Sequence, residues 1–270
     1  MIVVEFGVAM SDRALVERTR AGDARALGEL WKRHYRSGVR VARQYTSVAV
    51  DDVVAEAFIT CYERRLAGRG LDGAFRPLFY ASIREVASSR LGTQADATTD
   101  ALSRTLTARA FQSLPGEWRA VLWYLEVEGM DPHEAAPIVG MTANAVADVL
   151  YRARVGMRSA WLAGYAADAA ARGMRECEWT AAHLDMFTSH GLTSSDSDRV
   201  AVHLVACHRC SMLNRQEVDI VTRLALVMIP LVLGPHVGGR YLGLFGTARA
   251  LPAARDEVPP MPQLTQPLAS

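Results

Sequence analysis

Apolar side chains recur at three- and four-residue spacings along most of the 270-residue chain. This spacing gathers them on one face of an α-helix, and the sequence offers no convincing period-two strands with hairpin turns. The pattern first predicts two helices separated near Gly22. A third helix is expected to begin at Asp51 and Asp52, whose carboxylates suit a helix N-terminus, and a fourth is expected over 75–91. The sequence therefore predicts an all-α fold.

A change of pattern divides the chain after the fourth helix. The stretch GTQADATTDALSR, residues 92–104, is small, polar and aperiodic, which predicts a linker. Beyond it we expect two short helices and a longer one, with Asp131 and Glu134 forming a capping box and Thr142 capping the last helix. This is the layout of a helix-turn-helix, whose second helix enters the major groove of DNA. A helical hairpin with a solvated arginine face would have the same spacing.

The C-terminal third of the chain has three further parts. A small-residue joint, AGYAADAAARG, leads to a region that contains cysteines, and an apolar helix is predicted over 218–246. Its uncharged stretch 224–239 contains two prolines and is shorter than the roughly 20 apolar residues of a transmembrane helix. Packing on the rest of the chain or on a partner is therefore favoured over membrane association. The proline-rich stretch 247–270 is predicted to be a disordered tail.

Composition and charge narrow the class of protein. The formal net charge of +1 excludes a strongly basic coat for nucleic acid, although local basic segments are compatible with it. The start MIVVEFGVAMSDR has no signal-peptide pattern, so a cytoplasmic location with reduced thiols is expected. We find no glycine-rich phosphate loop and no nucleophile elbow, so an enzyme is not predicted. Cys61 is expected to be a small buried hydrophobic residue.

The octet HLVACHRC brings candidate metal ligands together. In a continuous helix His203, Cys207 and Cys210 would lie on one stripe, because positions i, i+4 and i+7 share a face. Imidazole and thiolate are ligands for zinc, and a closed structural site needs a fourth ligand. Cys177 is the nearby cysteine, with His183 as an alternative. These side chains could instead pack a small helical core.

Two stretches resemble a known family of transcription factors. The run LPGEWRAVLWYLEVEGMDPHEAAPIVGMTANAVADVLYRARVGMR resembles region four of extracytoplasmic-function (ECF) sigma factors, the subunits that guide bacterial RNA polymerase to promoters. The match lies in its LP-x-x-W-R-x-V-L opening, E-x-E-G turn and L-Y-R-A-R ending. DDVVAEAFITCYERR and FRPLFYASIR resemble region two of the same family. The resemblance implies region two over 11–91 and a helix-turn-helix region four over 105–163.

The resemblance also implies roles for individual residues. Docking on the polymerase core is implied for Asp51, Asp52, Val53, Glu56 and Phe58. Contact with the minus-ten promoter element is implied for Phe75, Arg76, Tyr80 and Arg84. Contact with the minus-thirty-five element is implied for Thr142, Asn144, Arg152, Arg154 and Arg158.

The chain departs from the family pattern at several of these surfaces. Leu78 and Glu85 stand where the family usually has a tryptophan and an asparagine, and Ala147 and Val149 stand where it has basic residues, with Asp148 between them. Base edges are read by donors such as arginine and lysine, so unusual promoter recognition is expected. The alternative hypothesis is a sigma-like sensor or interaction protein that does not initiate transcription.

The spacing C-x25-H-x3-C-x2-C over 176–217 resembles the zinc-binding anti-sigma domain. This resemblance implies Zn²⁺ bound by Cys177, His203, Cys207 and Cys210. It also implies that this domain and its apolar helix contact regions two and four within the same chain. Such a contact would mask the polymerase-binding surface. A zinc site of this type can be structural or redox-labile, because oxidation of its thiolates releases the metal.

Overall fold

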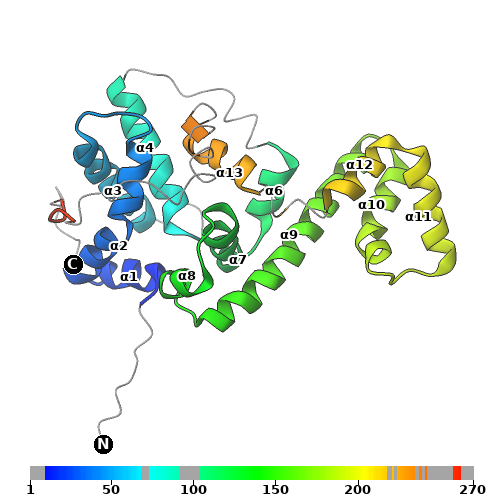
Figure 1. Cartoon of the computed structure of the whole chain (residues 1–270), viewed down its shortest axis with the longest axis horizontal. Coiled ribbons are helices and arrows are strands. Elements are labelled where there is room, and N and C mark those ends of the chain that lie inside the picture. The colour runs from blue at the N-terminus through cyan, green and yellow to red at the C-terminus, as the bar shows by residue number, and fades with distance from the viewer. Residues whose placement is uncertain are drawn as a thin grey trace, which may run out of the picture.

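The chain is helical wherever its secondary structure is regular (Figure 1). The computed structural model describes residues 10–67, 73–91, 104–217, 221, 224–234, 237–238, 241 and 258–262, and these residues include no strand. The all-α prediction is therefore confirmed. The helices are α1 (Asp12–Arg20), α2 (Ala24–Ala42), α3 (Val50–Leu66), α4 (Phe75–Leu91), α6 (Leu106–Ser113), α7 (Gly116–Leu122), the π-helix η1 (Trp123–Val127), α8 (Pro132–Val139), α9 (Ala143–Ala171), α10 (Arg175–Thr188), α11 (Ser194–Ala206), α12 (His208–Glu217) and α13 (Leu224–Leu233).

Helices α1 to α4 form an N-terminal bundle around an aromatic core. The predicted break between α1 and α2 is confirmed, because Gly22 adopts a positive φ and the Asp23 carboxylate accepts hydrogen bonds from the first backbone amides of α2. Phe79 and Tyr80 of α4 are fully buried, and Phe79 packs against Gly38 of α2 and edge-on against Phe58 of α3. Burial of these rings fixes the mutual orientation of the helices.

Helices α6 to α9, with η1, form a helix-turn-helix unit. The predicted capping box of α8 is present, with Asp131 accepting from the backbone and the Glu134 carboxylate accepting from the Asp131 amide. Thr142 caps α9 through a hydrogen bond from the Ala145 amide, as predicted. Gly140 joins the two helices at φ 76° in close contact with Ser11, which leaves no room for a Cβ. The helix-turn-helix unit therefore packs directly on the start of the N-terminal bundle.

The joint predicted after residue 163 is wrong, because α9 continues without interruption to Ala171. The stretch AGYAADAAA is rich in alanine, the strongest helix former, and it extends the helix. Helices α10 to α12, which we name the cysteine unit, pack on the C-terminal end of α9. In Figure 1 this unit stands at the far end of α9, away from the N-terminal bundle.

The apolar helix predicted over 218–246 is shorter in the structure. Helix α13 ends at Leu233, where Gly234 adopts φ 81°, and much of the rest of that stretch lies outside the described residues. As predicted, it packs on the rest of the chain, lying against α4, α6 and η1 (Figure 1). In the described part of the chain no helix combines the length and apolar character needed to cross a membrane.

Two predicted segments fall largely beyond what the structure describes. Of the linker predicted over 92–104, only Arg104 is described. Of the tail predicted over 247–270, residues 258–262 are described, and they lie against α2, where the Trp31 indole donates a hydrogen bond to the Pro259 carbonyl.

Candidate metal centre and interdomain surfaces

The four predicted metal ligands converge in the cysteine unit. Cys177 comes from the first turn of α10, while His203, Cys207 and Cys210 come from the junction of α11 and α12. One ligand atom from each of the four lies within 4.8 Å of the others. The Sγ atoms of Cys177 and Cys207 are 3.8 Å apart. This matches the roughly 3.8 Å edge of a tetrahedron with zinc-to-sulfur bonds of about 2.3 Å.

The local geometry differs from the continuous helix expected between His203 and Cys210. Helix α11 ends at Ala206, Cys207 is extended at φ −112° and ψ 105°, and α12 begins at His208. The bend turns Cys207 toward Cys177 while its amide still donates to the His203 carbonyl at 2.8 Å. The expected stripe is therefore replaced by two helix ends that meet at the ligands.

The donor set fits a metal ion of the zinc type. His203 Nε2 is buried with no hydrogen-bond partner, a condition that a metal bond would relieve. Backbone amides of the first turn of α12, that of Cys210 foremost, lower the pKa of the Cys207 thiol. Burial raises the pKa of Cys210 to about 12. Since a thiolate is the ligand form, Cys207 is the thiol best prepared to bind first.

His183, the alternative ligand, and Cys61, the remaining cysteine, lie outside the ligand cluster. His183 stacks on Trp179 with 4.1 Å between ring centroids, and its Nδ1 lies 2.8 Å from the Trp179 carbonyl oxygen, outside the ligand cluster. Cys61 is fully buried in the N-terminal bundle, as predicted, and burial raises its pKa to about 12. Tyr165 of α9 reaches the cluster, with its hydroxyl 3.9 Å from the Cys210 Sγ. The ligand cluster is therefore in contact with α9.

The residues predicted to dock on polymerase divide into two groups on α3. Asp51, Asp52 and Glu56 are exposed along one face of the helix. Val53 and Phe58 are buried in the N-terminal bundle and support that face from beneath. The Tyr35 hydroxyl donates to the Asp51 carboxylate at 2.7 Å, and Glu56 pairs with Arg90.

The residues predicted to contact the minus-ten element make contacts with other residues of this chain. Phe75 belongs to the core of the bundle at 1% exposure, stacked on His34. Tyr80, also 1% exposed, lies 6.4 Å ring to ring from Trp123 of the helix-turn-helix unit. Arg84 donates to the Leu231 carbonyl of α13 at 3.1 Å. Helix α4 therefore faces other parts of this chain at these positions.

Arg76 is the centre of a buried polar network between the two units. Its guanidinium pairs with Glu128, which also accepts from the Trp123 indole at 2.6 Å. Arg76 Nε donates to His34 Nδ1 at 3.3 Å, so the proton of a neutral His34 lies on Nε2 and is donated to Asp12 at 2.8 Å. Burial, opposed by Asp12, lowers the pKa of His34. Charge and hydrogen bonding thus join α1, α2, α4 and the end of η1.

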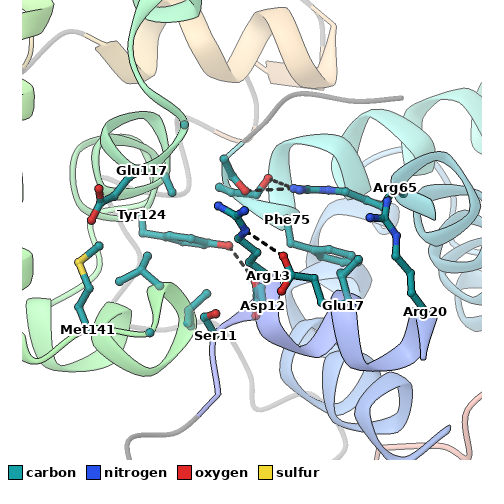
Figure 2. A pocket seen from close by; sticks show the side chains of 18 residues that line it. Ser11, Asp12, Arg13, Glu17, Arg20, Arg65, Phe75, Glu117, Tyr124 and Met141 are labelled. Carbon is teal, nitrogen blue, oxygen red and sulfur yellow. Dashed lines mark hydrogen bonds and ion pairs between the residues drawn. The ribbon is translucent and has the colours of Figure 1, made fainter. Parts of the chain in front are cut away.

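A cleft of about 850 Å³ opens beside this network, between α1 and the α7–α8 segment (Figure 2). The Tyr124 ring lies at its base, with the hydroxyl 3.4 Å from the Asp12 carboxylate. Burial works against ionisation of Asp12, but His34 and Arg33 together hold the pKa of its carboxyl below the usual value. At the mouth of the cleft Arg13 pairs with Glu17. Arg20 and Arg65, which also line the cleft, donate to backbone carbonyls.

Helix α9, predicted to be the recognition helix, has a mixed exposed face. Thr142 caps the helix, and Asn144, Arg152 and Arg154 are exposed, whereas Arg158 is partly buried. Arg154 pairs with Glu126 of η1 at 2.5 Å. Among the departures from the family pattern, Ala147 and Asp148 are exposed and Val149 is buried, so Val149 packs in the core rather than facing DNA.

Comparison with known proteins supports a sigma-factor function. The chain is similar to the ECF RNA polymerase sigma-E factor of Escherichia coli K12, with 27% identity over 175 residues that cover 54% of this chain and 91% of that protein. The proteins of the same name from Shigella flexneri and Salmonella typhimurium LT2 match with the same identity and coverage. No protein-family model matches the chain, and no solved structure matches it significantly. The distant homology points to a sigma-type regulator of transcription.

Proposed function

We propose that this chain is an ECF-type sigma factor that directs RNA polymerase to promoters and restrains its own promoter recognition. The observation that carries the first part is the similarity to sigma-E factors over 91% of their length. Its partners would be the polymerase core and promoter DNA, in the cytoplasm, and the chain itself would not act as an enzyme. The exposed carboxylates of α3, Asp51, Asp52 and Glu56, would form the core-binding face.

The self-restraint is inferred from the contacts that the predicted minus-ten residues make within the chain. Arg76 pairs with Glu128, Tyr80 packs near Trp123, and Arg84 binds the backbone of α13. Because other parts of the chain cover these side chains, promoter DNA could reach them only after α13 and the helix-turn-helix unit move away. In this proposal the inhibitory contact is made by α13, and the cysteine unit acts through α9, on which it packs.

Zn²⁺ is the proposed cofactor of the cysteine unit. Cys177, His203, Cys207 and Cys210 would complete a four-ligand tetrahedral set, the arrangement of structural zinc sites rather than of catalytic ones. Bound there, zinc supplies a cross-link between α10, α11 and α12. Through the contact between Tyr165 and Cys210, a metal-bound cysteine unit would then hold its position on α9.

Run-off transcription with purified polymerase core tests the self-restraint in the full-length chain. Ile229 of α13 is fully buried, whereas Leu226 on the same helix is 58% exposed. Ile229→Asp should raise promoter-dependent transcription at least about tenfold, since an unpaired buried carboxylate weakens a packed interface by several kcal/mol. Leu226→Asp is the matched control and should leave transcription unchanged. Equal transcription by the wild-type chain and Ile229→Asp would rule out restraint by α13.

A second candidate function is a sigma-like interaction protein that does not initiate transcription. The specific observation in its favour is the exposed face of α9, where Asp148 would repel phosphates and Arg154 is already paired with Glu126. A pull-down with polymerase core separates the two candidates. Retention of zinc without any binding of the core, in the wild type and in Ile229→Asp alike, would favour the interaction protein.

A further inference from the structure

The described part of the C-terminal tail is docked on the N-terminal bundle. Residues 258–262, Val-Pro-Pro-Met-Pro, lie beside α2 and are drawn in red in Figure 1. The Trp31 indole Nε1–H donates to the Pro259 carbonyl at 2.8 Å. Val258 and Met261 are partly buried against the hydrophobic core, whereas Pro260 between them is exposed. One hydrogen bond and two apolar contacts thus hold the segment.

Trp31 belongs to a platform of three aromatic side chains. Its ring lies 4.9 Å from that of Tyr35 and 5.1 Å from that of Phe58, and with the tail in place it is 2% exposed. Aromatic surfaces of this kind suit proline-rich segments, which favour an extended conformation and lose little entropy when they bind. An extended proline-rich segment makes no internal backbone hydrogen bonds, so its carbonyls are available to accept from an indole donor. The chemistry of the platform and that of the tail therefore match.

The aromatic platform adjoins the surface assigned to polymerase. Phe58 belongs to α3, and the Tyr35 hydroxyl donates to the carboxylate of Asp51 at 2.7 Å. Asp51 is one of the exposed acidic residues of the proposed core-binding face. The rings of Trp31 and Tyr35 thus connect the docked tail to that face.

We propose that residues 258–262 are an intramolecular ligand of the platform formed by Trp31, Tyr35 and Phe58, and that the docked tail competes with the polymerase core for α2 and α3. The competition, though not the docking, rests on the proposed sigma-factor function. The tail is tethered by the short stretch 242–257, and a short tether gives an effective concentration in the mM range, on the order of 1 mM. A weak contact is therefore enough to keep the platform occupied, while α13 separately covers the promoter-facing residues.

The docking is tested on the full-length chain without polymerase. Met261→Asp places a charge against the core, and Pro260→Asp places the same charge at the neighbouring exposed position as a matched control. The indole N–H resonance of Trp31, assigned by its loss in Trp31→Phe, should shift in Met261→Asp and stay unchanged in Pro260→Asp. A Trp31 resonance that is the same in both variants and in the wild type would overturn the docking.

The competition is tested by the equilibrium affinity of the same variants for purified polymerase core. We expect Met261→Asp to bind the core about three- to tenfold more tightly than the wild type, because the tethered competitor is lost, and Pro260→Asp to match the wild type. A shifted indole resonance with unchanged core affinity would overturn the competition. If no variant binds the core, the proposed function fails and the competition with it, while the indole resonance still decides the docking.

Discussion

The N-terminal bundle and the cysteine unit are stabilised by different means. The bundle surrounds Phe58 and Phe79 with further aromatic rings, all from residues that are almost completely buried. The cysteine unit buries few large apolar side chains, Leu184, Val200 and Leu213 among them, beside its ligand cluster. A unit of about 40 residues seldom buries enough apolar surface to fold alone and usually depends on a metal or on cross-links. Metal removal is therefore expected to affect the cysteine unit and to spare the bundle.

The first prediction separates the two regions by removing one metal ligand. Cys210→Ser, or chelation of the wild type, should unfold the cysteine unit, because a structural zinc site contributes apparent binding free energy on the order of 10 kcal/mol. Hydrogen exchange should lose its protection over α10 to α12 and keep it over α2 to α4. Released metal measured with a chromogenic chelator gives the stoichiometry.

Cys61→Ala is the matched control for that experiment. Cys61 is fully buried but lies in the apolar core of the bundle, far from the ligand cluster. Metal content should therefore remain at that of the wild type. Protection of α10 to α12 that survives both chelation and Cys210→Ser would contradict the dependence of this unit on a metal.

The second prediction concerns the polar contact between the bundle and the helix-turn-helix unit. Glu128 and Arg76 form a buried ion pair, and Glu128→Gln leaves the guanidinium without its charge partner. Loss of one member of a buried pair destabilises by about 3–5 kcal/mol, so urea unfolding followed by tryptophan fluorescence should shift to lower denaturant. Glu56→Gln is the control, because its pair with Arg90 is exposed and worth at most about 1 kcal/mol. Equal effects of the two variants would show that Glu128 does not hold the units together.

Local structure was the part of this fold that the sequence predicted best. The capping residues Asp131, Glu134 and Thr142 act through neighbours a few positions away, so the chain order alone determines them. The ligand set was found for a related reason, since His203, Cys207 and Cys210 are close in sequence. The geometry of these ligands could not be predicted from the sequence, because the bend at Cys207 depends on where Cys177 lies.

Long-range packing is what the sequence could not supply. Arg76 and Glu128 are far apart along the chain, and the periodicity of the sequence does not predict their contact. Val149 was placed with the DNA-facing residues by resemblance, but helix α9 turns it into the core. The tail was expected to be disordered on composition alone, while the Pro259 contact depends on an indole donor that α2 presents.

The last and smallest prediction places a pH dependence in the bundle. Burial lowers the pKa of His34 from its usual 6.5, so the folded chain holds this imidazole neutral where the unfolded chain protonates it. The stabilisation is therefore complete above about pH 6.5 and is lost as the pH falls below it. Protonation would add a hydrogen to Nδ1, which faces Arg76 Nε, with Arg33 also near and the Asp12 carboxylate as the opposing charge on Nε2.

Stability should fall as the pH drops below 6.5, with a limiting slope of about 1.4 kcal/mol per pH unit for one proton taken up on unfolding. Hydrogen exchange of α2 amides, compared at about pH 7.5 and about pH 5.5 after correction for the intrinsic rates, reports this loss without interference from acid release of metal in the cysteine unit. His34→Gln keeps an N–H donor toward Asp12 and cannot be protonated, so its stability should be flat over this interval. The carboxyl of Asp12, whose pKa is lowered from 3.8, stays ionised throughout. An equal slope in wild type and His34→Gln would assign the pH dependence of the bundle to a group other than His34.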